Sequence, residues 1–252
     1  MAEAEAETPA GVESEAKLRA SRRVFAALEG AQEAGGWQVT SRRDVSLRDT
    51  YWDTPDGYLA RAGSTLRVRE ESPQPPASGG GAGALAELTL KGPLPDMTAA
   101  NGAVWHRSEL TAHAPPGSGP AEWATLPEAK PVVEALAALA ALGARPPADG
   151  ESGGSRSGAD LLRRLRPDVV LRNPRREIVL EGEGSEAVLS LDEVAVEGMP
   201  YRRRYVEVEL KRGSTAALDR LVDALQAQYS LRPSRQGKVQ AARAWLTRRR
   251  AS

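Results

Sequence analysis

The sequence of 252 residues contains no cysteine and only two histidines. The lack of cysteine excludes disulfide bonds, thiolate catalysis and thiolate-bound metals. Two histidines are too few for a histidine-rich zinc site. A metal bound by this chain would therefore need carboxylate oxygens, which are the ligands that favour Mg²⁺, Mn²⁺ or Ca²⁺.

Long apolar segments are also missing. The longest, Ala135–Leu142, is too short to span a bilayer, and the acidic start MAEAEAETPAG has no apolar signal-peptide core. We therefore expect a cytoplasmic protein that does not enter a membrane. Lys+Arg and Asp+Glu both total 34, so the net charge gives no support to a nucleic-acid or membrane-surface function.

Charge of both signs is present in a regular pattern. In VESEAKLRA (12–20), charged residues occupy every second position, and an extended strand puts such positions on one face. Four later segments repeat the pattern. The charged faces are Glu13, Glu15 and Lys17; Arg67 and Arg69; Glu87, Thr89 and Lys91; Arg107 and Glu109; and Glu207, Glu209 and Lys211.

Lysine itself is scarce, with 5 residues against 29 arginines. Four of the five, Lys17, Lys91, Lys211 and Lys238, lie on these charged strands or in the C-terminal segment PSRQGK. A compact ammonium and a planar guanidinium bind differently. These four lysines therefore indicate positions where an ammonium is required.

The order of elements predicts one domain over 12–252, after a disordered acidic tail at 1–11. Pro/Gly/Ser-rich segments at about 72–86 and 144–158 are expected to be mobile loops. The expected strands are 12–20, 37–40, 44–52, 64–71, 87–91, 104–112, 168–181, 186–196 and 201–211. The expected helices are 22–34, 128–142, 159–165, 215–229 and one from about 235.

Two architectures fit the charged faces. One is a half-buried sheet with a solvated outer face. The other is an α+β fold in which eight antiparallel strands close into a tunnel barrel with a charged lumen, flanked by amphipathic helices. Two like charges ~4 Å apart repel by about 4 kcal/mol at an effective dielectric of ~20, so such a lumen needs interleaved carboxylates or a polyanionic ligand. Nearly all-charged faces on five strands favour the barrel.

Several short motifs in order strengthen this interpretation. They are Glu13-x-Glu15-x-Lys17, DTYWDT (49–54), LRVR (66–69), ELTLK (87–91), RSE (107–109), RREI (175–178), LSLDEV (189–194), VEVEL (206–210) and SRQGK (234–238). Together they resemble the CYTH domain, or triphosphate tunnel metalloenzyme, family over residues 13–240. The resemblance implies a tunnel barrel that binds a triphosphate compound together with Mg²⁺ or Mn²⁺.

The resemblance also implies roles for residues. The metal ligands would be Glu13, Glu15, Glu209 and Asp192. The phosphate ligands would be Lys17, Arg67, Arg69, Lys91, Arg107, Arg176 and Lys238, with Arg172 and Arg175 as alternatives to Arg176. Glu207 would position the attacking water, with Lys17 as its catalytic partner, and Glu109 would orient bases, metal or water.

The expected function is a metal-dependent triphosphatase acting on inorganic tripolyphosphate or a small organic triphosphate, with no nucleic-acid partner. A class IV-type adenylate cyclase and a non-catalytic polyphosphate- or nucleotide-binding module are the alternatives. Cyclases of the family typically begin the first strand with His-Phe, whereas this strand begins Gly11-Val12-Glu13. The candidate metal carboxylates Glu13, Glu15 and Glu209 argue against simple binding. The sequence leaves the oligomeric state open.

Overall fold

The computed structural model describes residues 12–73, 86–92, 103–142 and 158–251, and these form an α+β fold. The tail expected at 1–11 lies outside the described residues, as do most of the loops expected at 72–86 and 144–158. In the described ranges, no helix is long and apolar enough to cross a membrane.

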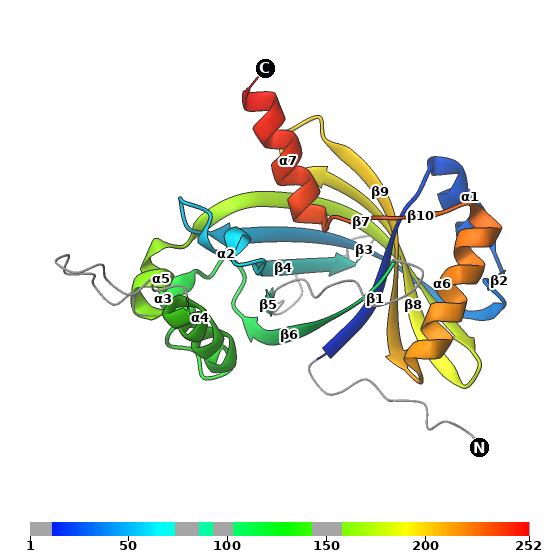
Figure 1. Cartoon of the computed structure of the whole chain (residues 1–252), viewed down its shortest axis with the longest axis horizontal. Helices are drawn as coiled ribbons and strands as arrows, with labels where there is room; N and C mark the ends of the chain where they lie inside the picture. The colour runs from blue at the N-terminus through cyan, green and yellow to red at the C-terminus, as the bar shows by residue number, and fades with distance from the viewer. Residues whose placement is uncertain (1–11, 74–85, 93–102, 143–157, 252) are drawn as a thin grey trace.

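Eight antiparallel strands close into a barrel, because the last strand of the series pairs back with the first (Figure 1). Two further strands of two residues each pair outside this ring: β2 (Glu33–Ala34) with β3, and β10 (Arg232–Pro233) with β1. In order around the barrel, the strands are β1 (Val12–Arg19), β6 (Val104–Ala114), β5 (Ala86–Lys91), β4 (Thr65–Pro73), β3 (Trp37–Asp53), β7 (Arg166–Gly182), β8 (Ser185–Val196) and β9 (Arg202–Arg212).

Apolar residues between the charged positions form the outer face of the barrel, which helices cover on two sides (Figure 1). Over β1, β8 and β9, the core contains Leu18, Val206 and Val208 under two helices, α1 (Arg22–Gly30) and α6 (Thr215–Tyr229). Over β4, β5 and β6, four other helices complete a second core: α2 (Tyr58–Arg61), α3 (Pro120–Trp123), α4 (Lys130–Leu142) and α5 (Gly158–Arg164).

A third core closes one end of the barrel. Tyr51 and Leu171, which have the inward parity of their strands, pack there with Val239 and Ala242 of helix α7 (Lys238–Arg250). The apolar end therefore fixes the first turn of α7 at the inner end of the lumen.

Two expected boundaries differ from the structure. The helix expected at 22–34 ends at Gly30, and Glu33–Ala34 turns back to pair with β3 through Gly35 and Gly36, both at positive φ. The strands expected at 37–40 and 44–52 form one strand, because pairing with β7 continues through a register shift between Val39 and Ser41.

Candidate active site

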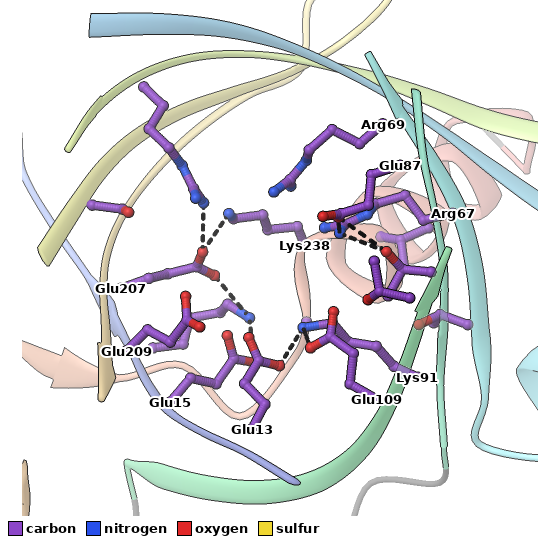
Figure 2. A pocket seen from close by; sticks show the side chains of 18 of the residues that line it. Glu13, Glu15, Arg67, Arg69, Glu87, Lys91, Glu109, Glu207, Glu209 and Lys238 are labelled. Atoms are coloured by element: carbon purple, nitrogen blue, oxygen red, sulfur yellow. Dashed lines mark hydrogen bonds and ion pairs between the residues drawn. The ribbon is translucent and has the colours of Figure 1, made fainter. Parts of the chain in front are cut away.

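The barrel encloses a cavity of about 440 Å³ lined by side chains from all eight of its strands and from the start of α7 (Figure 2). Nine of the lining residues are basic and eight are acidic, so their charges nearly cancel. The bases are Lys17, Arg43, Arg67, Arg69, Lys91, Arg107, Arg175, Lys211 and Lys238. The acids are Glu13, Glu15, Glu71, Glu87, Glu109, Glu177, Glu207 and Glu209.

One side of the lumen carries a cluster of carboxylates from β1 and β6. Glu13 lies beside Glu15 and Glu109, and Lys91 contacts both Glu13 and Glu109. Burial, followed by the charge of Glu15, raises the pKa of Glu13 to about 8. Burial acts the same way on Glu15, but the cations Lys17, Lys91 and Arg107 outweigh it and lower the pKa of Glu15. The pKa values of these two neighbouring carboxyl groups are therefore shifted in opposite directions.

Glu207 on β9 is the most heavily paired carboxylate in the lumen. One of its oxygens lies 2.9 Å from Lys17 Nζ, and the other accepts from Arg175 at 2.9 Å and from Lys238 at 2.6 Å. Burial tends to raise the pKa of Glu207, but these three cations lower it well below its usual value. Both oxygens are thus occupied by cations, so the direct effect of Glu207 is to hold three bases toward the lumen.

The opposite side of the lumen carries two arginines, one paired with the buried Asp49 and the other with Glu87, which itself lines the cavity. Arg69 forms two hydrogen bonds with Asp49, of 2.7 and 2.9 Å, and Arg67 contacts Glu87 at 2.6 Å. Figure 2 shows Arg67 and Arg69 across the cavity from Glu13 and Glu15, with Lys238 reaching toward Glu207 between them. The Glu13, Glu15 and Glu109 carboxylates, which are paired with Lys91 and Arg107, thus face Arg67 and Arg69 across an open centre.

Most of the candidate residues from the sequence line this cavity. Those that do are Glu13, Glu15, Lys17, Arg67, Arg69, Lys91, Arg107, Glu109, Glu207, Glu209 and Lys238. Asp192 is fully buried just outside the lining, where it binds Arg175 at 2.7 Å and Lys238 at 2.7 Å. In this structure Asp192 is a support for two bases and does not face the open centre.

Arg176 lies on the outer face of the barrel. Its guanidinium forms two hydrogen bonds with Asp44, of 2.7 and 2.8 Å, outside the barrel. Arg175 occupies the inward position instead. The expectation for Arg176 is therefore corrected to Arg175, because adjacent residues of a strand point to opposite faces.

Some residues of the site were not predicted from the sequence: Arg43, Tyr51 and Ser190, which line the cavity, and Asp49, which supports Arg69. The motif DTYWDT contains Asp49 and Tyr51, which are two residues apart and therefore lie on the same face of their strand. An acid and a tyrosine on one face of this motif were the available signal.

The carboxylate cluster fits a hard cation in chemistry, since all its donors are oxygens. Over the ranges that the structure describes, however, no three acidic or histidine side chains are grouped as a metal site. Lysine and arginine nitrogens occupy the carboxylates: Lys91 contacts Glu13, Arg107 contacts Glu15 at 2.8 Å, and Lys211 contacts Glu209 at 2.5 Å. Glu13, Glu15 and Glu209 could hold Mg²⁺ or Mn²⁺ once these bases turn to another partner.

Comparisons with known proteins agree with the barrel. A family model described as the CYTH domain matches residues 12–242. HpAC1 from Hippeastrum, an adenylyl cyclase candidate described as having a dominant triphosphatase activity, is 20% identical with a TM-score of 0.55, over 92% of this chain and 95% of that one. An adenylate cyclase candidate from Bacillus halodurans is 20% identical with a TM-score of 0.50, over 92% and 98% of the two chains.

PH1819 from Pyrococcus horikoshii OT3 is 14% identical with a TM-score of 0.50, over 92% of this chain and 99% of that one. No curated protein matches the sequence significantly. At these identities the solved structures establish a shared fold and nothing finer.

Proposed function

Because the chain belongs to the CYTH domain family, we propose that it is a metal-dependent triphosphatase that hydrolyses inorganic tripolyphosphate or a small organic triphosphate in its tunnel. The observation that carries the proposal is one lumen in which a carboxylate cluster, Glu13, Glu15 and Glu109, faces the guanidinium groups of Arg67 and Arg69. A triphosphate with its metal needs both, since metal binds carboxylate oxygens and phosphate binds guanidinium and ammonium groups.

In this proposal the bases of the lumen bind the phosphate oxygens. Arg67, Arg69 and Arg175 offer planar donors that suit phosphate, and Lys238 adds a compact charge at the start of α7. These cations stabilise the charge that develops on the leaving diphosphate. The activity described for HpAC1 supports the choice of hydrolysis over cyclisation.

Glu13, Glu15 and Glu209 would hold Mg²⁺ or Mn²⁺, which supplies Lewis-acid stabilisation of phosphate oxygens when bound. The bases that now pair with these carboxylates, Lys91, Arg107 and Lys211, would then be free to contact phosphate. Glu207 and Asp192 keep Arg175 and Lys238 oriented throughout, because their oxygens stay paired with those bases.

A phosphate-release assay tests the proposal over tripolyphosphate, thiamine triphosphate, ATP and pyrophosphate, with Mg²⁺ or Mn²⁺ and with EDTA. We expect orthophosphate from at least one triphosphate, and loss of the activity in EDTA. Cyclic AMP with pyrophosphate as the products of ATP would assign a cyclase instead. Tight binding of tripolyphosphate without any turnover would assign a binding module.

A further inference from the structure

We infer that an exposed arginine surface outside the tunnel binds long-chain inorganic polyphosphate. This surface, called here the arginine face, consists of five exposed residues: Arg19, Arg22, Arg23, Arg232 and Arg235. The face is a structural fact independent of the proposed function, whereas the choice of polyphosphate as its ligand rests on that function.

The fold brings these arginines together from three separate segments. Arg19 ends β1 and pairs directly across from Arg232 of β10. Arg22 and Arg23 open α1 two residues after β1 ends, and Arg235 follows β10. Figure 1 shows β10 lying beside β1 near the start of α1. A chain with no net charge therefore concentrates positive charge at one place.

The arginines of this face also lack the acidic partners that exposed arginines such as Arg61 and Arg163 have. Within the described part of the chain, none of the five forms an ion pair or a side-chain hydrogen bond. By contrast, Arg61 lies 2.8 Å from Asp56, and the exposed Arg163 pairs with Asp160. On the adjoining β8–β9 pair, Glu193 is already paired with Arg204 at 2.5 Å.

Two of these placements oppose local stability. Like charges directly across from each other on neighbouring strands repel, as Arg19 and Arg232 do here. Cations in the first turn of a helix oppose its dipole, and the first turn of α1 contains Arg22 and Arg23 and no acid. An anion bound across the face would relieve both effects at once.

The chemistry of the face favours polyphosphate over nucleic acid. Guanidinium groups bind phosphate oxygens in pairs. Recognition of single-stranded nucleic acid also uses aromatic rings on which bases stack. Tyr205 of β9, which lies directly across from Arg19, is 3% exposed and offers no such surface. A phosphate chain without bases, of the same repeating unit as the proposed tunnel ligand, uses all that the face provides.

Binding of fluorescently labelled long-chain polyphosphate tests the inference, measured in EDTA and with tripolyphosphate saturating the tunnel. The variant Arg22→Ala/Arg232→Ala should bind polyphosphate about tenfold more weakly. Its binding should also depend less steeply on salt, since fewer phosphate contacts release fewer counterions. The control Arg61→Ala/Arg163→Ala removes the same charge from exposed sites on α2 and α5, and should bind like the wild type.

Three outcomes would overturn the inference: displacement of polyphosphate by tripolyphosphate, equal weakening in both double variants, or equally tight binding of double-stranded DNA or phosphatidylserine vesicles. Hydrolysis of tripolyphosphate should be unchanged in Arg22→Ala/Arg232→Ala. If no triphosphate is hydrolysed while polyphosphate still binds the arginine face, only the proposed function fails.

Discussion

At the scale of single residues, two adjacent arginines on β7 divide the inside of the barrel from its outside. Arg175 reaches the lumen and contacts Asp192 and Glu207, whereas Arg176 reaches the outer surface and contacts Asp44. The two residues have the same side chain and nearly the same position in the chain. They therefore form a matched pair for testing what the lumen does.

We predict that Arg175→Ala lowers kcat/KM for tripolyphosphate by about 100-fold or more, since one preorganised charged donor contributes on that order. Arg176→Ala should stay within about twofold of the wild type, because surface ion pairs contribute little. Steady-state kinetics of the two variants, with circular dichroism to check the fold and Arg175→Lys as the conservative change, decide the matter. Equal losses of kcat/KM in both variants would show that the lumen takes no part in the reaction.

The same pair shows why sequence alone misassigned a residue. The motif RREI offers two candidates, and a shift of one residue along a strand reverses the face. Ile178 belongs to the core under the helices, so Arg176, two residues earlier, shares its outward face. Applied to this strand, the parity rule that placed Glu13 and Arg67 correctly would have selected Arg175. Support by a buried Asp192 could not be deduced, because it depends on the distance between β7 and β8.

Glu13 makes the stability of the metal-free protein depend on pH. Its pKa is raised from 4.5 to about 8, so the folded state binds a proton more tightly than the unfolded state does. That contribution is complete below pH 4.5 and is lost as the pH rises through about 8. A divalent cation competes with the same proton, so its affinity rises over this window.

We predict that, in EDTA, the melting temperature of Glu13→Gln falls less than that of the wild type as the pH is raised from about 4.5 to about 8. Glutamine keeps the shape of the side chain and cannot ionise. Thermal denaturation across this window is the measurement, with Glu209→Gln as the control at the more exposed carboxylate. Parallel curves for the wild type and Glu13→Gln would contradict the assignment of the proton to this group.

At the scale of elements, the alternating strands were largely predictable and the helices that position the site were less so. Segments such as ELTLK have one apolar and one charged face, so their parity and their inward charges follow from spacing alone. The short helices α2 and α3 were not expected, because four-residue helices depend on tertiary contacts such as the packing of Trp123 against Trp52. The role of α7 depends on a core of residues distant in sequence.

Helix α7 should be essential for placing Lys238. Val239 and Ala242 are buried at the apolar end of the barrel, next to the residue that contacts Asp192 and Glu207. Val239→Asp buries an unpaired charge there, and we expect it to cost about 3 kcal/mol and to remove most activity. Thr247→Ala, on the exposed end of the same helix, is the control. Thermal melting and phosphate release report on both, and an unchanged Val239→Asp would mean that α7 does not position the site.

At the scale of the whole molecule, the lumen is an almost complete set of internal ion pairs. Each carboxylate that could take a metal already holds a base, and each base that could take a phosphate already holds a carboxylate. Metal and triphosphate can therefore replace these ion pairs only when both bind, the metal taking the carboxylates and the triphosphate taking the bases. Either ligand alone leaves charges of one sign without partners, at a cost that the closed lumen makes large.

We predict that tripolyphosphate binds at least about tenfold more tightly in the presence of Mg²⁺ than in EDTA, a coupling of about 1.4 kcal/mol, and that Mg²⁺ is bound more tightly by the same factor when tripolyphosphate is present. Titration calorimetry with Glu13→Gln/Glu15→Gln, which cannot hydrolyse in this proposal, reports the effect that remains without those carboxylates. Independent binding of the two ligands to the wild type would contradict the exchange. Sulfate at matched ionic strength is the control for general screening.

The closure of the barrel also sets an order of events during synthesis. β1 leaves the ribosome well before β9, which is one of its two barrel neighbours and lies about 190 residues later. At ordinary rates of translation β1 waits about 10–40 s for that neighbour. Until then this edge of β1 is unpaired, and Lys17 has no contact with Glu207. The nascent chain must therefore keep its first strand soluble through its own charge, which the E-x-E-x-K pattern supplies before any ligand is bound.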